Sequence, residues 1–186
     1  MRRRAREAAA TVILEAAEEV AAARGLDATS TAAIAERAGV AVGTLYNYFP
    51  DRDALLAALF KLRRDALLPR MIAAAEAAAH LPFEERLRAY LEGVARALEE
   101  FRPFCRVAMS AEGALRARPR SAVLAAVTEA LEAILRPAVK GRADDLARML
   151  FGAFKALIHC RLERDEPFEP AARLTAETFL EGLVRR

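Results

Sequence analysis

The sequence predicts an all-α protein, and two observations carry that prediction. Alanine, leucine, arginine and glutamate dominate the composition, and these residues favour helix, whereas the residues that strands prefer are sparse. Prolines and glycines divide the chain into helix-sized pieces. With 186 residues, the chain is long enough to bury a core, either as one domain or as two small ones.

Three helices are predicted within the first fifty residues, at 6–24, at 31–38 and at about 41–48. Ser30 can cap the second of these helices, because its hydroxyl can accept a hydrogen bond from the first turn. Gly39 can adopt the left-handed conformation that ends that helix. Short helices joined by a glycine turn are typical of a helix-turn-helix unit.

The rest of the chain continues in helices. A fourth helix is predicted to begin at Asp51 or Asp53, and it either ends at Pro69 or continues beyond this proline with a kink. Further helices are expected at 83–101, 103–112, 119–135, 144–164 and 170–184.

Several function classes are disfavoured. The formal net charge is only +3, so any nucleic-acid binding must come from local placement of charge. Glutamates interrupt the apolar stretch near the amino end, so it is not a signal peptide. The longest uncharged run, 38–50, is too short to cross a bilayer. We therefore expect a soluble, cytoplasmic protein.

Cysteine and histidine also give no sign of an enzyme or a metal site. Cys105 and Cys160 form no CxxC pair, so buried, reduced thiols are expected. His159 is interpreted as a core histidine. The sequence contains no nucleophile with a visible base partner, no HExxH and no phosphate-binding loop. We expect neither catalysis nor a cofactor nor a metal.

The predicted helix at 41–48 has two different sides. Leu45 and Phe49 lie where an inner core would be, whereas Ala41, Asn47 and Tyr48 fall within about 60° of Thr44 on the helical wheel. On this second face, Asn47 can bond an adenine edge, and the Ala41 methyl group can meet a thymine methyl. This face is predicted to enter a DNA major groove.

Other residues near this helix can contact the DNA backbone. Tyr46 and Tyr48 carry hydroxyls suited to phosphate or base contacts, Gly43 leaves room for close backbone approach, and Arg52 can hold a phosphate. Arginines in the first six residues form either a DNA-contacting arm or a solvated, disordered tail. The predicted DNA-binding residues are Arg3, Arg4, Thr29, Ala41, Val42, Gly43, Thr44, Tyr46, Asn47, Tyr48 and Arg52.

The residues from Arg6 to Leu55, and above all AERAGVAVGTLYNYFPDRDALL, resemble the amino-terminal domain of TetR-family repressors. The family pattern contains Ala-Gly-Val, then Gly-Thr-Leu-Tyr-x-Tyr-Phe and a basic residue. Ala41 departs from it, because the family often has a serine there that caps the recognition helix, and Val42 replaces a residue that is often polar or basic. The resemblance implies a helix-turn-helix domain at 1–52 and a helical ligand-binding and dimerisation domain at 53–186.

The second part of the chain resembles nothing specific, so only its architecture is predicted. Two adjacent apolar stripes on 144–164, and a similar surface on the last helix, indicate burial on more than one side. Such a pair of helices can form a four-helix bundle with a second copy, the dimer that the resemblance also implies; the alternative is that both helices are central to a monomer core. The predicted interface residues are Leu150, Phe151, Phe154, Ile158, Phe179 and Leu183.

An apolar ligand pocket is expected among the helices from 83 to 135. Its predicted lining is Tyr90, Val94, Phe101, Phe104, Cys105, Met109 and Leu131, each of which has ordinary core packing as its alternative. The resemblance implies that an effector shifts these helices and moves the two DNA-reading heads out of register.

The sequence thus leads to a sequence-specific DNA-binding transcriptional regulator. The hypothesis is a homodimeric repressor on a palindromic operator of double-stranded DNA, released by a small apolar effector, with no cofactor and no membrane. The alternative is a helical interaction protein that happens to contain a three-helix unit. Salt-dependent DNA binding would distinguish the two.

Overall fold

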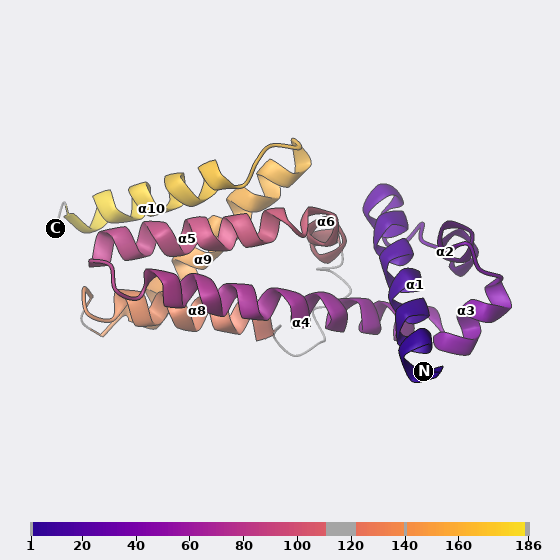
Figure 1. Cartoon of the computed structure of the whole chain (residues 1–186). Coiled ribbons are helices and arrows are strands. Elements are labelled where there is room, and N and C mark those ends of the chain that lie inside the picture. The colour runs from indigo at the N-terminus through magenta and orange to yellow at the C-terminus, as the bar shows by residue number, and fades with distance from the viewer. Residues whose placement is uncertain (1, 111–121, 140, 185–186) are drawn as a thin grey trace. The chain divides into compact units, whose positions relative to one another are not determined.

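The structure is a computed structural model, and it describes residues 2–110, 122–139 and 141–184. Within these ranges the chain is helical and contains no strand (Figure 1), which confirms the predicted fold class. The described helices are α1 (Arg2–Arg24), α2 (Thr31–Ala38), α3 (Val42–Tyr48), α4 (Arg52–Ala78), α5 (Phe83–Glu99), α6 (Arg102–Ser110), α8 (Ala122–Leu135), α9 (Ala143–Glu163) and α10 (Glu169–Val184).

The helices form two compact units. The first unit contains the residues up to Arg63 together with the part of α6 that follows Arg102. The second contains Arg64–Arg102 and the described residues from α8 onward. The domain boundary expected at residue 52 stays a prediction. The observed packing divides within α4, because Leu55 and Leu59 of that helix belong to the core of the first unit.

The first unit is a three-helix arrangement closed by the start of α4. Its core is formed by apolar side chains from all four helices: Ile13, Leu14, Ala16, Ala17, Ile34, Ala35, Leu45, Phe49, Leu55 and Leu59. A partly buried ion pair between Glu18 of α1 and Arg63 of α4 adds a polar link. Phe60 of α4 meets Phe104 of α6 edge to face, with ring centroids 5.2 Å apart.

The local signals at the helix-turn-helix act as predicted. The Ser30 hydroxyl accepts a hydrogen bond from the backbone N–H of Ala33 at 3.1 Å, which satisfies one donor of the first turn of α2. Gly39 ends α2 with φ 69°, and its N–H donates back to the helix. The turn thus sets the direction in which α3 leaves α2.

The observed bounds of α1 and α4 answer two questions that the sequence left open. Helix α1 begins at Arg2, so the amino-terminal arginines form a helical turn and not a disordered tail. Helix α4 continues through Pro69 to Ala78, since the backbone around a proline can remain helical when neighbouring packing compensates for the lost hydrogen bond.

The second unit is a helical bundle. Helix α10 packs against α5 and α9, and α8 packs against α9 (Figure 1). Helices α4 and α5 approach closely at Gly93, where an added Cβ would lie 2.9 Å from the Cβ of Ala74. In the described part of the chain, no helix combines the length and apolar character needed to span a membrane.

Candidate nucleic-acid interface and the interior of the second unit

Helix α3 packs into the core of the first unit with one side and exposes the other side to solvent. Leu45 is fully buried and Phe49 is 8% exposed, so both lie in the core as predicted. Asn47 is exposed, and Tyr46 is 47% exposed. The buried side therefore fixes the helix while the amide of the chain's one asparagine stays accessible to a partner.

The remaining predicted contacts on α3 and its first turn are also accessible. Ala41, Val42 and Gly43 are exposed, whereas Thr44 and Tyr48 are half-buried. Ala41 occupies the cap position of α3 and makes no side-chain cap hydrogen bond. The amides of this first turn therefore have no side-chain cap from their own helix.

Arg6 of α1, which the sequence analysis did not assign to the site, holds the end of α3. It donates a hydrogen bond from Nη2 to the backbone carbonyl of Asn47 at 3.3 Å. Its guanidinium also lies 5.7 Å from the ring centroid of Tyr48, a cation–π distance. A cation at the carboxyl end of a helix is favourable for the helix dipole. The signal in the sequence was the cluster of arginines, but its partner lies 41 residues away.

Two residues predicted to contact DNA make hydrogen bonds within the fold, and their contact with DNA stays a prediction. Thr29 is only 3% exposed, and its hydroxyl donates to the carbonyl of Gly25 at 2.7 Å. Arg52 donates from Nε to the carbonyl of Thr29 at 3.2 Å and from Nη2 to the carbonyl of Leu26. Arg52 thus ties the α1–α2 connection to the start of α4, because loop carbonyls need donors that no helix supplies.

Contacts between α2 and α3 complete the surface. The hydroxyls of Thr31 and Tyr46 lie 3.4 Å apart, so the exposed tyrosine is oriented by the first residue of α2. Arg37 at the end of α2 pairs with Glu19 of α1, and Arg4 is exposed on α1. The side chain of Arg3 lies outside the described part of the chain.

Tyr90 of α5 is the unusual polar group of the second unit. Its side chain is fully buried, and its hydroxyl has no hydrogen-bond partner among the described residues. Burial raises the pKa of the phenol, because desolvation penalises the charged form. Tyr90 is therefore a neutral hydroxyl in an apolar interior.

The other predicted pocket residues fall into both units. Val94, Phe101 and Leu131 are buried in the second unit, whereas Phe104, Cys105 and half-buried Met109 belong to the first. Their role as a common ligand lining stays a prediction.

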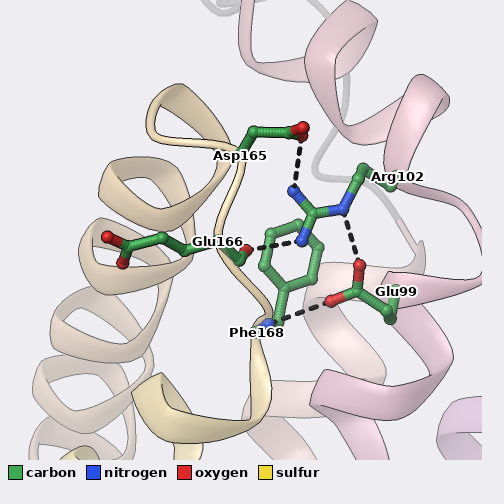
Figure 2. A network of polar contacts seen from close by, with 5 residues as sticks. All are labelled: Glu99, Arg102, Asp165, Glu166 and Phe168. Atoms are coloured by element: carbon green, nitrogen blue, oxygen red, sulfur yellow. Dashed lines mark hydrogen bonds and ion pairs between the residues drawn. The ribbon is translucent and has the colours of Figure 1, made fainter.

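A polar network ties the carboxyl end of α5 to the α9–α10 connection, within the second unit (Figure 2). Arg102 donates to Glu99 at 2.6 Å, to Asp165 at 3.3 Å and to the carbonyl of Glu166 at 2.5 Å. Its guanidinium lies 4.3 Å from the Phe168 ring centroid. The backbone N–H of Phe168 donates to Glu99 at 2.9 Å, which closes the network.

The charge state of Glu99 reflects this network. Desolvation raises its pKa, but the hydrogen bonds from Arg102 and from the Phe168 N–H, with the charge of Arg102, lower it more, so the pKa of Glu99 lies below its usual value. Asp165 has φ 56°, a left-handed conformation that is uncommon outside glycine. The contact with Arg102 helps to hold this turn in place.

The predicted interface residues are distributed between the core and the surface. Leu150, Phe154 and Ile158 are at most 2% exposed within the chain's own fold, since they lie on the α9 face that packs into the bundle. Phe151 and Phe179 are half-buried, and the side chain of Leu183 lies outside the described part. On the same two helices, Met149 is 59% exposed and Leu174 is 49% exposed.

Two expectations about α9 are wrong. Cys160 is exposed, unlike buried Cys105. His159 is also exposed, and its Nε2 lies 3.3 Å from an oxygen of Glu163. Both residues lie on the solvent-exposed side of α9, whereas Phe154 and Ile158 lie on its buried side. In the described ranges, no group of histidine, cysteine or acidic side chains is arranged to hold a metal ion.

The geometry defines a class of protein, one with an amino-terminal helix-turn-helix and a larger helical bundle. Comparison with known families agrees, because residues 13–59 match the model of the bacterial regulatory proteins of the tetR family. A TetR-like transcriptional regulator from Rhodococcus sp. RHA1 is 27% identical and covers 97% of both chains, with a TM-score of 0.70. The chain is thus similar to TetR-family transcriptional regulators, by the family model over residues 13–59 and by its fold over almost its whole length.

Two further relatives concern fatty acids. Over 59 residues, the chain is 41% identical to the fatty acid metabolism regulator protein of Bacillus subtilis (strain 168), a match that spans 32% of this chain and 30% of that protein. The structure of FadR from Bacillus subtilis in complex with stearoyl-CoA has a TM-score of 0.69 at 22% identity and covers 92% of this chain and 98% of that one. At that identity, the second likeness shows the fold alone.

Proposed function

We propose that the chain is a sequence-specific DNA-binding regulator that acts in the cytoplasm as a homodimeric repressor. The observation that carries the proposal is the geometry of α3, whose Leu45 and Phe49 are buried while Asn47 is exposed. An amide on such a face can make two hydrogen bonds to adenine in the major groove. Arg6 supports the face by fixing the last turn of α3.

The proposed dimer would use the apolar residues that the fold leaves exposed on α9 and α10. Met149 and Leu174 are the exposed members, and Phe151 and Phe179 are half-buried residues of the same helices. Buried Leu150, Phe154 and Ile158 would support this surface from beneath. A two-fold dimer would place two α3 helices on successive half-sites, so the operator should be palindromic.

The proposed effector is a small molecule with a long apolar chain, of the acyl-thioester class. The support is the apolar interior of the second unit and the likeness to regulators whose names refer to fatty acids or whose structure holds stearoyl-CoA. Effector binding would favour the state that does not bind DNA, which releases the operator.

The experiment is selection of bound sequences from a random duplex pool with the full chain, followed by affinity measurements at several salt concentrations. We expect a palindromic consensus and an affinity that falls steeply with salt, because phosphate contacts release counterions. A helical interaction protein, the alternative function, would enrich no sequence. Absence of any enriched sequence would overturn the proposal.

A further inference from the structure

We propose that the Tyr90 hydroxyl donates a hydrogen bond to a neutral carbonyl oxygen of the effector, such as that of a thioester, and so distinguishes acyl effectors from plain hydrocarbon chains. This inference rests on the proposed function, since it names the polar group that the effector must carry. The starting observation is a fully buried phenol whose oxygen has no partner among the described residues.

A buried hydroxyl without a partner is unfavourable, because it has lost its hydrogen bonds to water and gained none. Phenylalanine would fill nearly the same space without this loss. The hydroxyl therefore requires an acceptor that the described side chains and backbone do not supply. A bound ligand with an acceptor oxygen would supply it.

The ion pair between α5 and α10 lies on the other side of α5 from Tyr90. Glu92, about 160° from Tyr90 by helical spacing, pairs with Arg173 of α10 at 3.4 Å, whereas Gly93, about 60° from Tyr90, lies against Ala74 of α4. Helical spacing puts Leu87 and Val94 within about 60° of Tyr90, and both are buried. The buried neighbours of the phenol on its own helix are thus apolar, which suits a hydrocarbon chain, whereas half-buried Arg86 on the same face already donates to the carbonyls of Leu81 and Ala79.

The interior also determines which acceptor can be bound. Burial raises the pKa of Tyr90, so the phenol stays protonated and acts as a donor. The only buried polar or charged side chain of the second unit's described residues, apart from Tyr90, is Thr175, and its hydroxyl already donates to the carbonyl of Ala171 at 2.6 Å. With no buried cation there, a free carboxylate would be buried without a counter-charge, which is costly. A neutral carbonyl fits the site better.

The test compares two probes that differ by the carbonyl group, stearoyl-coenzyme A and its thioether analogue S-octadecyl-coenzyme A. Their dissociation constants are measured by calorimetry for the wild-type chain, for Tyr90→Phe and for the control Thr175→Val. We expect Tyr90→Phe to bind the thioester about tenfold more weakly, the size of one lost hydrogen bond, and to bind the thioether within about twofold of wild type. Thr175→Val should leave both affinities unchanged, because its hydroxyl is already satisfied within α10.

The stability of the ligand-free protein separates this role from ordinary packing. Tyr90→Phe should leave its Tm unchanged or raise it, since the substitution removes an unpartnered group. An equal loss of affinity for both probes, or no loss for either, would overturn the assignment of Tyr90 and leave the proposed function intact. Failure of the wild-type chain to bind stearoyl-coenzyme A while it binds its selected DNA would overturn the assignment together with the proposed effector class.

Discussion

In each unit, an arginine at the first position of a helix bonds to a connection between other helices, but the two arginines have different acceptors. Arg52 of the first unit donates to two backbone carbonyls, those of Leu26 and Thr29. Arg102 of the second unit bonds two carboxylates and a carbonyl and covers an aromatic ring. Both arginines tie a connection to a helix, but we expect only the tie made by Arg102 to respond to pH, because only its acceptors include carboxylates.

The largest effect is expected from Arg102→Ala. The Arg102 side chain is 18% exposed, and its loss would leave Glu99 and the carbonyl of Glu166 without their main donor. We expect the free energy of unfolding in urea to fall by about 2–4 kcal/mol. Arg136→Ala is the matched control, because Arg136 is 73% exposed and pairs with Glu132 four residues earlier; it should change stability by less than about 0.5 kcal/mol. Similar losses for both variants would contradict the role of the network.

Arg52→Ala should have the next largest effect. It removes two hydrogen bonds to loop carbonyls, so unfolding should become easier by about 1–2 kcal/mol. If Arg52 is a tie and not a phosphate contact, the folded variant should keep the salt dependence of DNA affinity that the wild type shows. A salt slope reduced by about one unit would return Arg52 to the DNA interface.

Arg6→Ala should be milder, because Arg6 is exposed. The loss of its hydrogen bond to Asn47 and of its contact with the Tyr48 ring should cost about 0.5–1 kcal/mol of stability. Arg4→Ala, on the same helix and also exposed, serves as the control in the same urea titration. An equal effect of the two substitutions would mean that Arg6 does not hold α3.

The smallest expected effect is the pH dependence of the stability lost in Glu99→Gln. It distinguishes the Arg102 network from the Arg52 hydrogen bonds. Because the folded protein lowers the pKa of Glu99, the stability gained from its charge is present above the unfolded pKa of about 4.3 and is lost as pH falls through the folded pKa. The stability difference between wild type and Glu99→Gln should therefore shrink on acidification. The corresponding difference for Arg52→Ala should stay constant, since its acceptors are neutral carbonyls. A difference for Glu99→Gln that is unchanged in acid would contradict this account.

The local parts of the fold could be predicted from the sequence, because the signals lie within one or two turns. Ser30 and Gly39 set the ends of α2, and the spacing of Leu45 and Phe49 identified the inner side of α3. Contacts between distant residues could not be predicted this way. The bond from Arg52 to Thr29 spans 23 residues, and that from Arg102 to Glu166 spans 64, whereas helical periodicity describes one helix at a time.

Contacts between distant residues also decide which side of α9 is buried in the second unit. The apolar stripes of α9 predicted wide burial, but which stripe faces the bundle depends on α8 and α10 and not on α9 itself. Phe154 and Ile158 therefore lie in the core while Met149 is exposed. For Tyr90, the sequence predicted a place in an apolar interior, but only the folded structure shows that its hydroxyl lacks a partner among the described residues.

The most direct test of the account is the base discrimination of Asn47→Ala on the selected duplex, measured by competition with duplexes that replace each adenine of the half-site in turn. We expect the variant to stay folded and to lose about 1–3 kcal/mol of preference at one adenine position, while Thr178→Ala, an exposed substitution on α10, keeps the wild-type pattern. An Asn47→Ala chain with the affinity and base preferences of the wild type would contradict the central claim that the exposed face of α3 reads DNA.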